Sequence, residues 1–273
     1  MPQVTRLDWI ARLGYFARAV VYMMLGYIAL STASKAADGQ SAVFDRLREL
    51  PGGTAWLLLI GVGLLAYGLF RLATAFLDLD HEGGKWKGIA KRGGKLFSGI
   101  AHILLAYTAF QFISQVKQSG GGDQKSHEAA GTLLDLPLGS LLLGMVGVYF
   151  LITAGSQAMK AYKASFMEEV QAGAPDFTRT VGRLGHAARA AVFAVIGFSF
   201  IQAAWFDDEN KARAIGGALA SLRDQGTLYT LVAVGLILFG VFSLILARYA
   251  IVPKIDLAHA GRSRAAGMRG STA

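Results

Sequence analysis

Cysteine is absent from the 273-residue chain, and charged residues are scarce at 16%. Without cysteine there is no disulfide, no thiolate nucleophile, no iron–sulfur cluster and no cysteine-bound zinc. A soluble domain is about 25% charged, so this deficit, beside 53% hydrophobic residues, excludes a simple water-soluble globule. It also excludes a disordered chain, which needs low hydrophobicity and high charge. The composition is that of a membrane protein.

Six long apolar stretches contain no aspartate or glutamate. A helix needs roughly 20 apolar residues to cross the hydrocarbon core of a bilayer. The stretches of suitable length are Tyr15–Thr32, Thr54–Leu77, Leu96–Val116, Leu136–Met159, Ala187–Phe206 and Thr227–Tyr249. All four tryptophans fall at or just outside the ends of these stretches, where amphipathic rings prefer the headgroup level. The predicted fold class is all-α, a polytopic membrane protein with six transmembrane helices.

Lysine and arginine are distributed unequally between alternate loops. The N-terminal segment, the second and fourth loops and the C-terminal tail hold 16 of them, against 8 in the other three loops. Basic residues accumulate on the cytoplasmic side of membrane proteins, so we expect both termini in the cytoplasm. The same asymmetry accounts for the net charge of +9, and no nucleic-acid partner is expected.

One plan is repeated three times along the chain. Arg12–Gly26 and Arg183–Gly197 are identical at 8 of 15 positions, and a weaker middle copy begins at Gly94. In the second helices, Gly63–Phe70 matches Gly235–Phe242. The predicted units are 7–77, 88–160 and 179–250, followed by a basic tail over 251–273. Two spans per unit keep the copies in one orientation, which predicts a bundle with pseudo-threefold symmetry about the membrane normal and not an inverted-repeat transporter.

Small residues recur at equivalent positions in the first helices, where lipid-embedded helices pack closely. These positions are Ala19, Gly99 and Ala190. Two helical turns further on they are Gly26, Ala106 and Gly197. The outer loops carry apolar residues on one face, which predicts short interfacial helices there. The faces consist of Phe44, Leu47 and Leu50 in the first loop and of Ala218, Leu219 and Leu222 in the third.

The motif Arg-Leu-Gly-x-x-Ala-Arg-Ala-x-Val-aromatic runs from Arg12 to Tyr22 and again from Arg183 to Phe193. With its diverged middle copy, it resembles a bacterial family of uncharacterised membrane proteins built from a three-times-repeated pair of transmembrane helices. The resemblance covers nearly all of residues 7–250. The middle unit departs most, because Ser98 stands where the first unit has an arginine. The resemblance implies a bacterial inner membrane, no known activity and no catalytic residues.

The sequence offers little for catalysis or metal binding. No two of the five histidines form a metal-binding pair on a helix, and Glu168-Glu169 is expected to be a solvated face. The spans lack the paired carboxylates of acid–base chemistry and the intramembrane acid usual in ion-coupled transporters. We therefore expect no cofactor, no metal and no catalytic residue.

The candidate site residues are Arg18, Arg71, Arg189 and His102, which are ionisable groups inside the spans. Arg18 and Arg189 lie about one turn inside their spans, and Arg71 lies near the cytoplasmic end of its own. Arginines at this depth can snorkel to the interface, with Asp8, Asp78 or Asp80 as partners. Alternatively, at least one faces the bundle interior and helps to form an anion-accepting pocket. His102 is either a packing residue or a proton carrier.

Three functions compete. The first is a non-catalytic protein that binds anionic lipid headgroups, a membrane-protein partner or a second copy through the arginine layer. The second is a passive channel or facilitator along the pseudo-threefold axis. The third, a lipid-modifying enzyme, ranks last because the sequence offers no nucleophile and base.

Overall fold

The computed structural model describes residues 6–31, 38–78, 82–114 and 122–251, apart from a few side chains at the edges of these ranges. The described part is helical and contains no β-strand. Six helices are long and apolar enough to cross a membrane, which confirms the predicted fold class. They are α1 (Arg6–Ser31), α3 (Gly53–Leu77), α4 (Trp86–Ile113), α6 (Gly139–Lys163), α7 (Thr178–Phe206) and α9 (Thr227–Tyr249). The predicted tail beyond Ile251 and the span ends at Thr32 and 115–116 lie outside the described residues.

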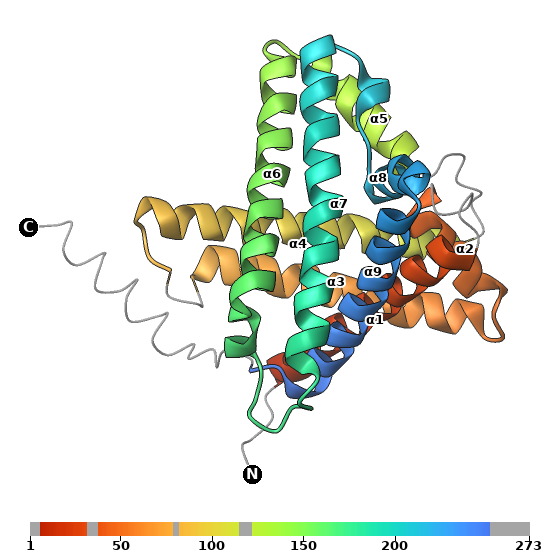
Figure 1. Cartoon of the computed structure of the whole chain (residues 1–273), viewed down its shortest axis with the longest axis vertical. Helices are drawn as coiled ribbons and strands as arrows, with labels where there is room; N and C mark the ends of the chain where they lie inside the picture. Colours follow the sequence, from red (N-terminus) through yellow and green to blue (C-terminus); the bar gives the residue numbers. More distant parts are fainter. Residues whose placement is uncertain (1–5, 32–37, 79–81, 115–121, 252–273) are drawn as a thin grey trace, which may run out of the picture.

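The long helices pack as three close pairs, α1 with α9, α3 with α4, and α6 with α7. Each pair joins the second helix of one unit to the first helix of another, and α9 closes the cycle on α1. In Figure 1 the pair α6/α7 stands upright, α3/α4 runs across the view, and α1/α9 lies obliquely. The three pairs are thus inclined to one another, and a rotation of about 120° between the units stays a prediction.

Equivalent small residues meet where these pairs cross. The contacts join Gly68 to Gly99, Gly147 to Gly197 and Gly240 to Ala19. A Cβ atom added to any of the three glycines of the second helices would lie 2.8–2.9 Å from the backbone oxygen of its partner, closer than real Cβ atoms come. Because lipid supplies no hydrophobic drive for helix association, such backbone approach is what holds the pairs together.

The same turn leads into α3 and α6. Gly52 and Leu138, each directly before its helix, have left-handed φ angles of 72° and 64°. A side chain on the next residue, Gly53 or Gly139, would collide with a carbonyl oxygen of the preceding short helix. The Leu-Pro-x-Gly pattern therefore sets a tight reversal between each short helix and the span that follows it.

Three short helices lie at one end of the bundle, which we call the cap end: α2 (Gln40–Glu49), α5 (Gly122–Leu134) and α8 (Ile215–Leu222). Helices were expected at α2 and α8, and their apolar faces are buried in the bundle, whereas Leu50 follows α2 and is exposed. The sequence analysis did not predict α5. The opposite end, where α1, α4 and α7 begin, is the basic end.

The bundle interior next to the cap end is filled by fully buried apolar side chains. The largest of these are Leu25, Leu57, Ile60, Leu64, Leu236, Phe44 and Leu219, from α1, α3, α9, α2 and α8. Phe44 of α2 also contacts Phe112 of α4, with ring centroids 5.8 Å apart. The candidate residues Arg18, Arg71, Arg189 and His102 lie on the other side of this core, toward the basic end.

Candidate functional site

The structure brings all four candidate residues to one aromatic cluster. Tyr67 of α3 has its ring 5.7 Å from the Arg18 guanidinium carbon, 5.4 Å from that of Arg71 and 4.7 Å from the His102 ring. Phe239 of α9 lies 5.1 Å from the guanidinium of Arg18 and 4.4 Å from that of Arg189. We call the three arginines with Tyr67 and Phe239 the arginine cluster.

Arg18 and Arg189 lie further from the starts of their helices than the sequence suggested. α1 and α7 begin at Arg6 and Thr178, nine residues before the predicted spans. Arg18 and Arg189 are therefore twelve and eleven residues into their helices, about 16–18 Å at a rise of 1.5 Å per residue. Their guanidinium groups lie on aromatic rings, that of Arg18 4.9 Å from Tyr15 and that of Arg189 4.4 Å from Phe239, whereas snorkelling would take them to the interface.

Arg18 is fixed by hydrogen bonds. Its Nε donates to the Ser243 hydroxyl at 3.0 Å, and a terminal nitrogen donates to the Tyr67 hydroxyl at 3.4 Å. The Ser243 hydroxyl in turn donates to the backbone oxygen of Phe239 at 2.8 Å. With 9% of its surface exposed, Arg18 ties α1 to α3 and α9.

Arg71 and Arg189 are left with unused donors. Both are half-buried, and the Nε atom of each is buried without a hydrogen-bond partner. Arg189 instead lies over aromatic rings, 4.9 Å from Phe193 and 5.5 Å from Tyr22. Within the described ranges, no carboxylate forms an ion pair with any arginine of the cluster.

The nearby acids have other partners. Glu82 pairs with Lys91 at 2.7 Å and with Lys95 at 3.5 Å, and Glu169 pairs with Lys160 at 3.2 Å. Asp78 accepts the backbone N–H groups of Gly83 and Glu82, both at 2.9 Å, and these bonds, Gly83 first, hold its pKa below the usual value. Asp78 is thus not the partner that snorkelling invoked, and the Asp8 side chain and Asp80 lie outside the described residues.

The charge balance of the cluster favours an added anion. An arginine at mid-membrane costs about 2.5–3.5 kcal/mol on insertion scales, and a cation–π contact returns about 0.5–2 kcal/mol. Arginine has only donors, and the surrounding groups are rings and hydroxyls. The cluster can therefore accept an oxyanion, whereas among the described residues no group of histidine, aspartate and glutamate is suited to a metal ion.

His102 is held by its own helix. Its Nδ1 donates to the backbone oxygen of Ser98 at 2.7 Å, which leaves Nε2 as the acceptor of a neutral ring. A second buried histidine, which the sequence analysis did not select, is His186 of α7. Its Nδ1 lies 2.5 Å from the Gln157 side-chain oxygen, and its Nε2 is buried without a partner.

The repeat contains a signal for the residues that the sequence analysis missed. Gly63–Phe70 matches Gly235–Phe242, so Tyr67 corresponds to Phe239 and the next matched position pairs Arg71 with Ser243. The match between the first and third units therefore marks Phe239 and Ser243 as the counterparts of Tyr67 and Arg71.

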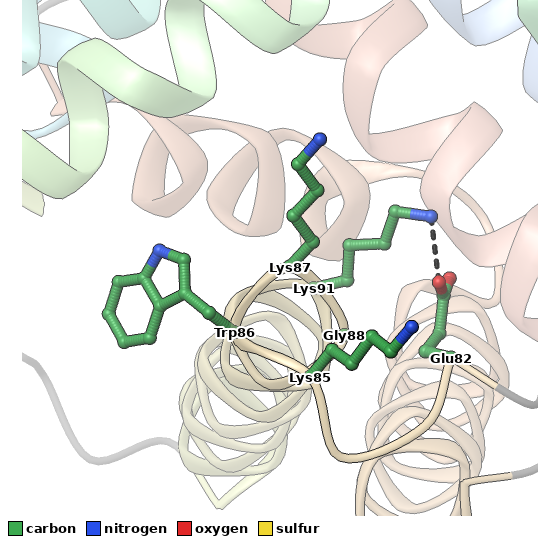
Figure 2. A pocket seen from close by; sticks show the side chains of 6 residues that line it. All are labelled: Glu82, Lys85, Trp86, Lys87, Gly88 and Lys91. Carbon is green, nitrogen blue, oxygen red and sulfur yellow. Dashed lines mark hydrogen bonds and ion pairs between the residues drawn. The ribbon is translucent and has the colours of Figure 1, made fainter.

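A separate basic pocket of about 610 Å³ lies at the start of α4. It is lined by Glu82, Lys85, Trp86, Lys87, Gly88 and Lys91. Figure 2 shows Lys91 turned toward Glu82 and Trp86 pointing away from the other labelled side chains. Because Glu82 is paired with Lys91, this surface is a weaker anion site than the arginine cluster.

Comparison with known proteins agrees with the repeat. A Bacillus subtilis (strain 168) protein described as "Uncharacterized protein YxxB" is 33% identical over 248 residues, 87% of this chain and 89% of that protein. No solved structure matches the chain. The family model described as Domain of Unknown Function (DUF1206) matches it three times, over residues 13–78, 93–164 and 184–250. The resemblance seen in the sequence is thereby confirmed: the chain is a multi-pass membrane protein that belongs to the DUF1206 family, with three copies of its domain.

Proposed function

We propose that this protein is a non-catalytic protein of the bacterial inner membrane, with both termini in the cytoplasm, that holds an anionic lipid headgroup in the arginine cluster. The observation that carries the proposal is the convergence of Arg18, Arg71 and Arg189 on two rings without a carboxylate. The unused donors on Arg71 and Arg189 support it, because a buried donor without a partner costs about 1–3 kcal/mol or more.

The apolar core at the cap end weighs against the alternative of a passive channel. A conducting path needs polar groups or water along its whole length. The side chains of Leu25, Leu64 and Leu236 are fully buried in the interior beyond the arginines. A headgroup site at the arginine cluster needs no such path.

The orientation is tested with reporter fusions. The excess of basic residues at the basic end predicts that fusions after Gly88 and after Ala265 report the cytoplasm and that a fusion after Gly122 reports the periplasm. Alkaline phosphatase and a fluorescent protein serve as paired reporters, since each is active on one side only. The reverse pattern at the three sites would reject the orientation.

The headgroup site is tested by replacing each arginine with lysine. Lysine keeps the positive charge but loses the planar five-donor fork that matches phosphate. We expect Arg71→Lys and Arg189→Lys to retain less than about half of the anionic lipid that the unmodified protein carries through purification, measured by mass spectrometry of extracted lipid. The matched control is Arg179→Lys, at an exposed position in the first turn of α7. Equal lipid content in all variants would contradict the proposal.

A further inference from the structure

The middle unit is built differently from the other two where its own helices face each other. In the first unit, a Cβ atom added to Gly63 would lie 2.8 Å from the Cβ of Ala17, and in the third Gly235 meets Ala188 in the same way. These small residues let α1 approach α3 and α7 approach α9. The corresponding middle residues follow from the helix crossings: Phe97 stands two positions before Gly99, as Ala17 does before Ala19, and Leu142 stands five positions before Gly147, as Gly63 does before Gly68.

Two aromatic rings lie between α4 and α6. Phe97 and Tyr149 contact each other with centroids 4.5 Å apart, and the Tyr149 hydroxyl donates to the backbone oxygen of Gly94 at 3.5 Å. α4 and α6 make no close backbone contact of the kind that closes the other two units. Their membrane-spanning segments are also the least buried of the six, at 22% each. The bundle therefore has one side that is open between the helices of a unit.

An apolar groove of about 350 Å³ occupies this opening. It is lined by Phe97, Leu133, Leu142, Met145, Val146 and Tyr149 from α4, α5 and α6. The volume is within the range of about 300–1,000 Å³ typical of small-molecule sites. The lining is apolar apart from the Tyr149 hydroxyl, which α4 already engages, so the occupant that fits is a hydrocarbon chain.

A continuous row of aromatic rings leads from the groove to the arginine cluster. Phe97 contacts Phe150 at 5.6 Å, Phe150 contacts Phe193 at 5.9 Å, and Phe193 lies 4.9 Å from the Arg189 guanidinium. On α4, His102 touches Tyr67 of the cluster. The groove between α4 and α6 and the arginine cluster are thus joined by continuous apolar contacts.

The charge of the cluster selects among phosphate headgroups. Three arginines without a carboxylate partner carry three positive charges into the membrane. A phosphodiester lipid brings a single negative charge, whereas a phosphomonoester carries about −1.5 to −2 at pH 7, with a second pKa near 6. It also offers three oxygens to the arginine forks. The phosphomonoester therefore compensates the cluster better.

We propose that the arginine cluster binds the phosphate of a lipid phosphomonoester whose hydrocarbon chain lies in the groove between α4 and α6. The inference rests on the proposed function and names the ligand of the same site. Free phosphate shares the headgroup chemistry but has no chain to occupy the groove. The two sources are therefore separated by their dependence on the groove.

The experiment titrates delipidated protein in detergent with dioleoyl phosphatidic acid, dioleoyl phosphatidylglycerol and inorganic phosphate at pH 7.5. Phosphatidic acid is expected to bind at least about 10-fold more tightly than phosphatidylglycerol, because of its extra charge. At pH 5 the preference should shrink to about 2-fold, since the phosphomonoester is then largely monoanionic. Inorganic phosphate is expected to compete with phosphatidic acid at much higher concentration.

The groove is tested with Met145→Trp, which fills it. The matched control is Leu231→Trp, outside the groove and at a similarly exposed position on α9: Leu231 is 64% exposed and Met145 is 59% exposed. Met145→Trp should weaken phosphatidic acid binding at least about 5-fold and leave the affinity for inorganic phosphate itself unchanged, and Leu231→Trp should change neither. If Met145→Trp does not purify, Leu142→Trp fills the same groove.

The outcomes separate the two proposals. Equal affinity for phosphatidic acid and phosphatidylglycerol, or equal effects of Met145→Trp and Leu231→Trp, overturns this inference while the headgroup site stands. The inference is also overturned if inorganic phosphate binds as tightly as phosphatidic acid, because the lipid chain then adds no affinity. Absence of binding by both lipids, with no effect of the arginine variants, overturns the proposed function itself.

Discussion

Replacement of Gly147 by leucine is expected to force α6 away from α7 and to lower the melting temperature of the purified protein by roughly 10 °C or more. A Cβ atom at Gly147 would lie 2.8 Å from the Gly197 oxygen and 2.9 Å from the Ile201 nitrogen. Both are backbone atoms, so the contact cannot be relieved by a side-chain rotation. The helices must separate, and in lipid that loses the packing that holds them together.

Gly155→Leu is the matched control, because it lies on the same helix, two turns away, with open space around the added side chain. Its melting temperature should stay within about 2 °C of that of the unmodified protein. Thermal unfolding of both variants in the same detergent is followed by the loss of monodisperse protein. Equal melting temperatures would mean that α6 and α7 do not depend on this crossing.

The six spans were predictable because hydrocarbon thickness fixes the length of an apolar run. The first turns of α1, α4 and α7 were not predictable, because they are polar and precede the apolar run. α4 begins at Trp86, although the apolar run begins at Leu96. Hydropathy reports where a helix contacts hydrocarbon, and backbone hydrogen bonding continues into the headgroup layer. This is why the sequence placed Arg18 and Arg189 closer to the starts of their helices than they are.

The sequence also could not predict which helices pack against each other. Gly99 and Gly197 were recognised as contact positions, but a small residue does not specify which helix approaches it. The structure assigns them to Gly68 and Gly147, so each unit contacts its neighbour more closely than itself. The helix α5 was missed because its polar sequence and weak apolar face give no periodic signal.

The arginines of the site were selected from the sequence because ionisable groups in a span stand out. Their phenylalanine neighbours Phe193 and Phe239 were not selected, since phenylalanine in a membrane helix is ordinary. Phe239 becomes part of the site only through the crossing of α9 over α1, which brings it to both Arg18 and Arg189. The opening at α4 and α6 likewise depends on comparing Leu142 with its counterparts Gly63 and Gly235, which the helix crossings identify.

Arg189→Met is expected to raise the melting temperature of the lipid-free protein by roughly 2–4 °C and to abolish the further rise that anionic lipid produces. Methionine matches the length of the arginine stem and packs well on the rings of Phe193 and Phe239. It removes a charge that costs about 2.5–3.5 kcal/mol in the membrane and has no carboxylate partner, in exchange for cation–π contacts of about 0.5–2 kcal/mol. A net gain near 1 kcal/mol corresponds to a few degrees in a protein of this size.

Arg18→Met should have the opposite sign in the lipid-free protein. Arg18 donates to the hydroxyls of Ser243 and Tyr67, and hydrogen bonds from a charged donor contribute about 1.5–3 kcal/mol each. The stability lost with these two hydrogen bonds exceeds the stability gained by removing the charge. The melting temperature should therefore fall. Melting curves of both variants with and without phosphatidylglycerol make the comparison. If both variants melt at a lower temperature and both keep the lipid-induced rise, the arginines serve packing alone. If Arg189→Met is more stable and no longer responds to lipid, the positive charge of Arg189 serves to bind a ligand.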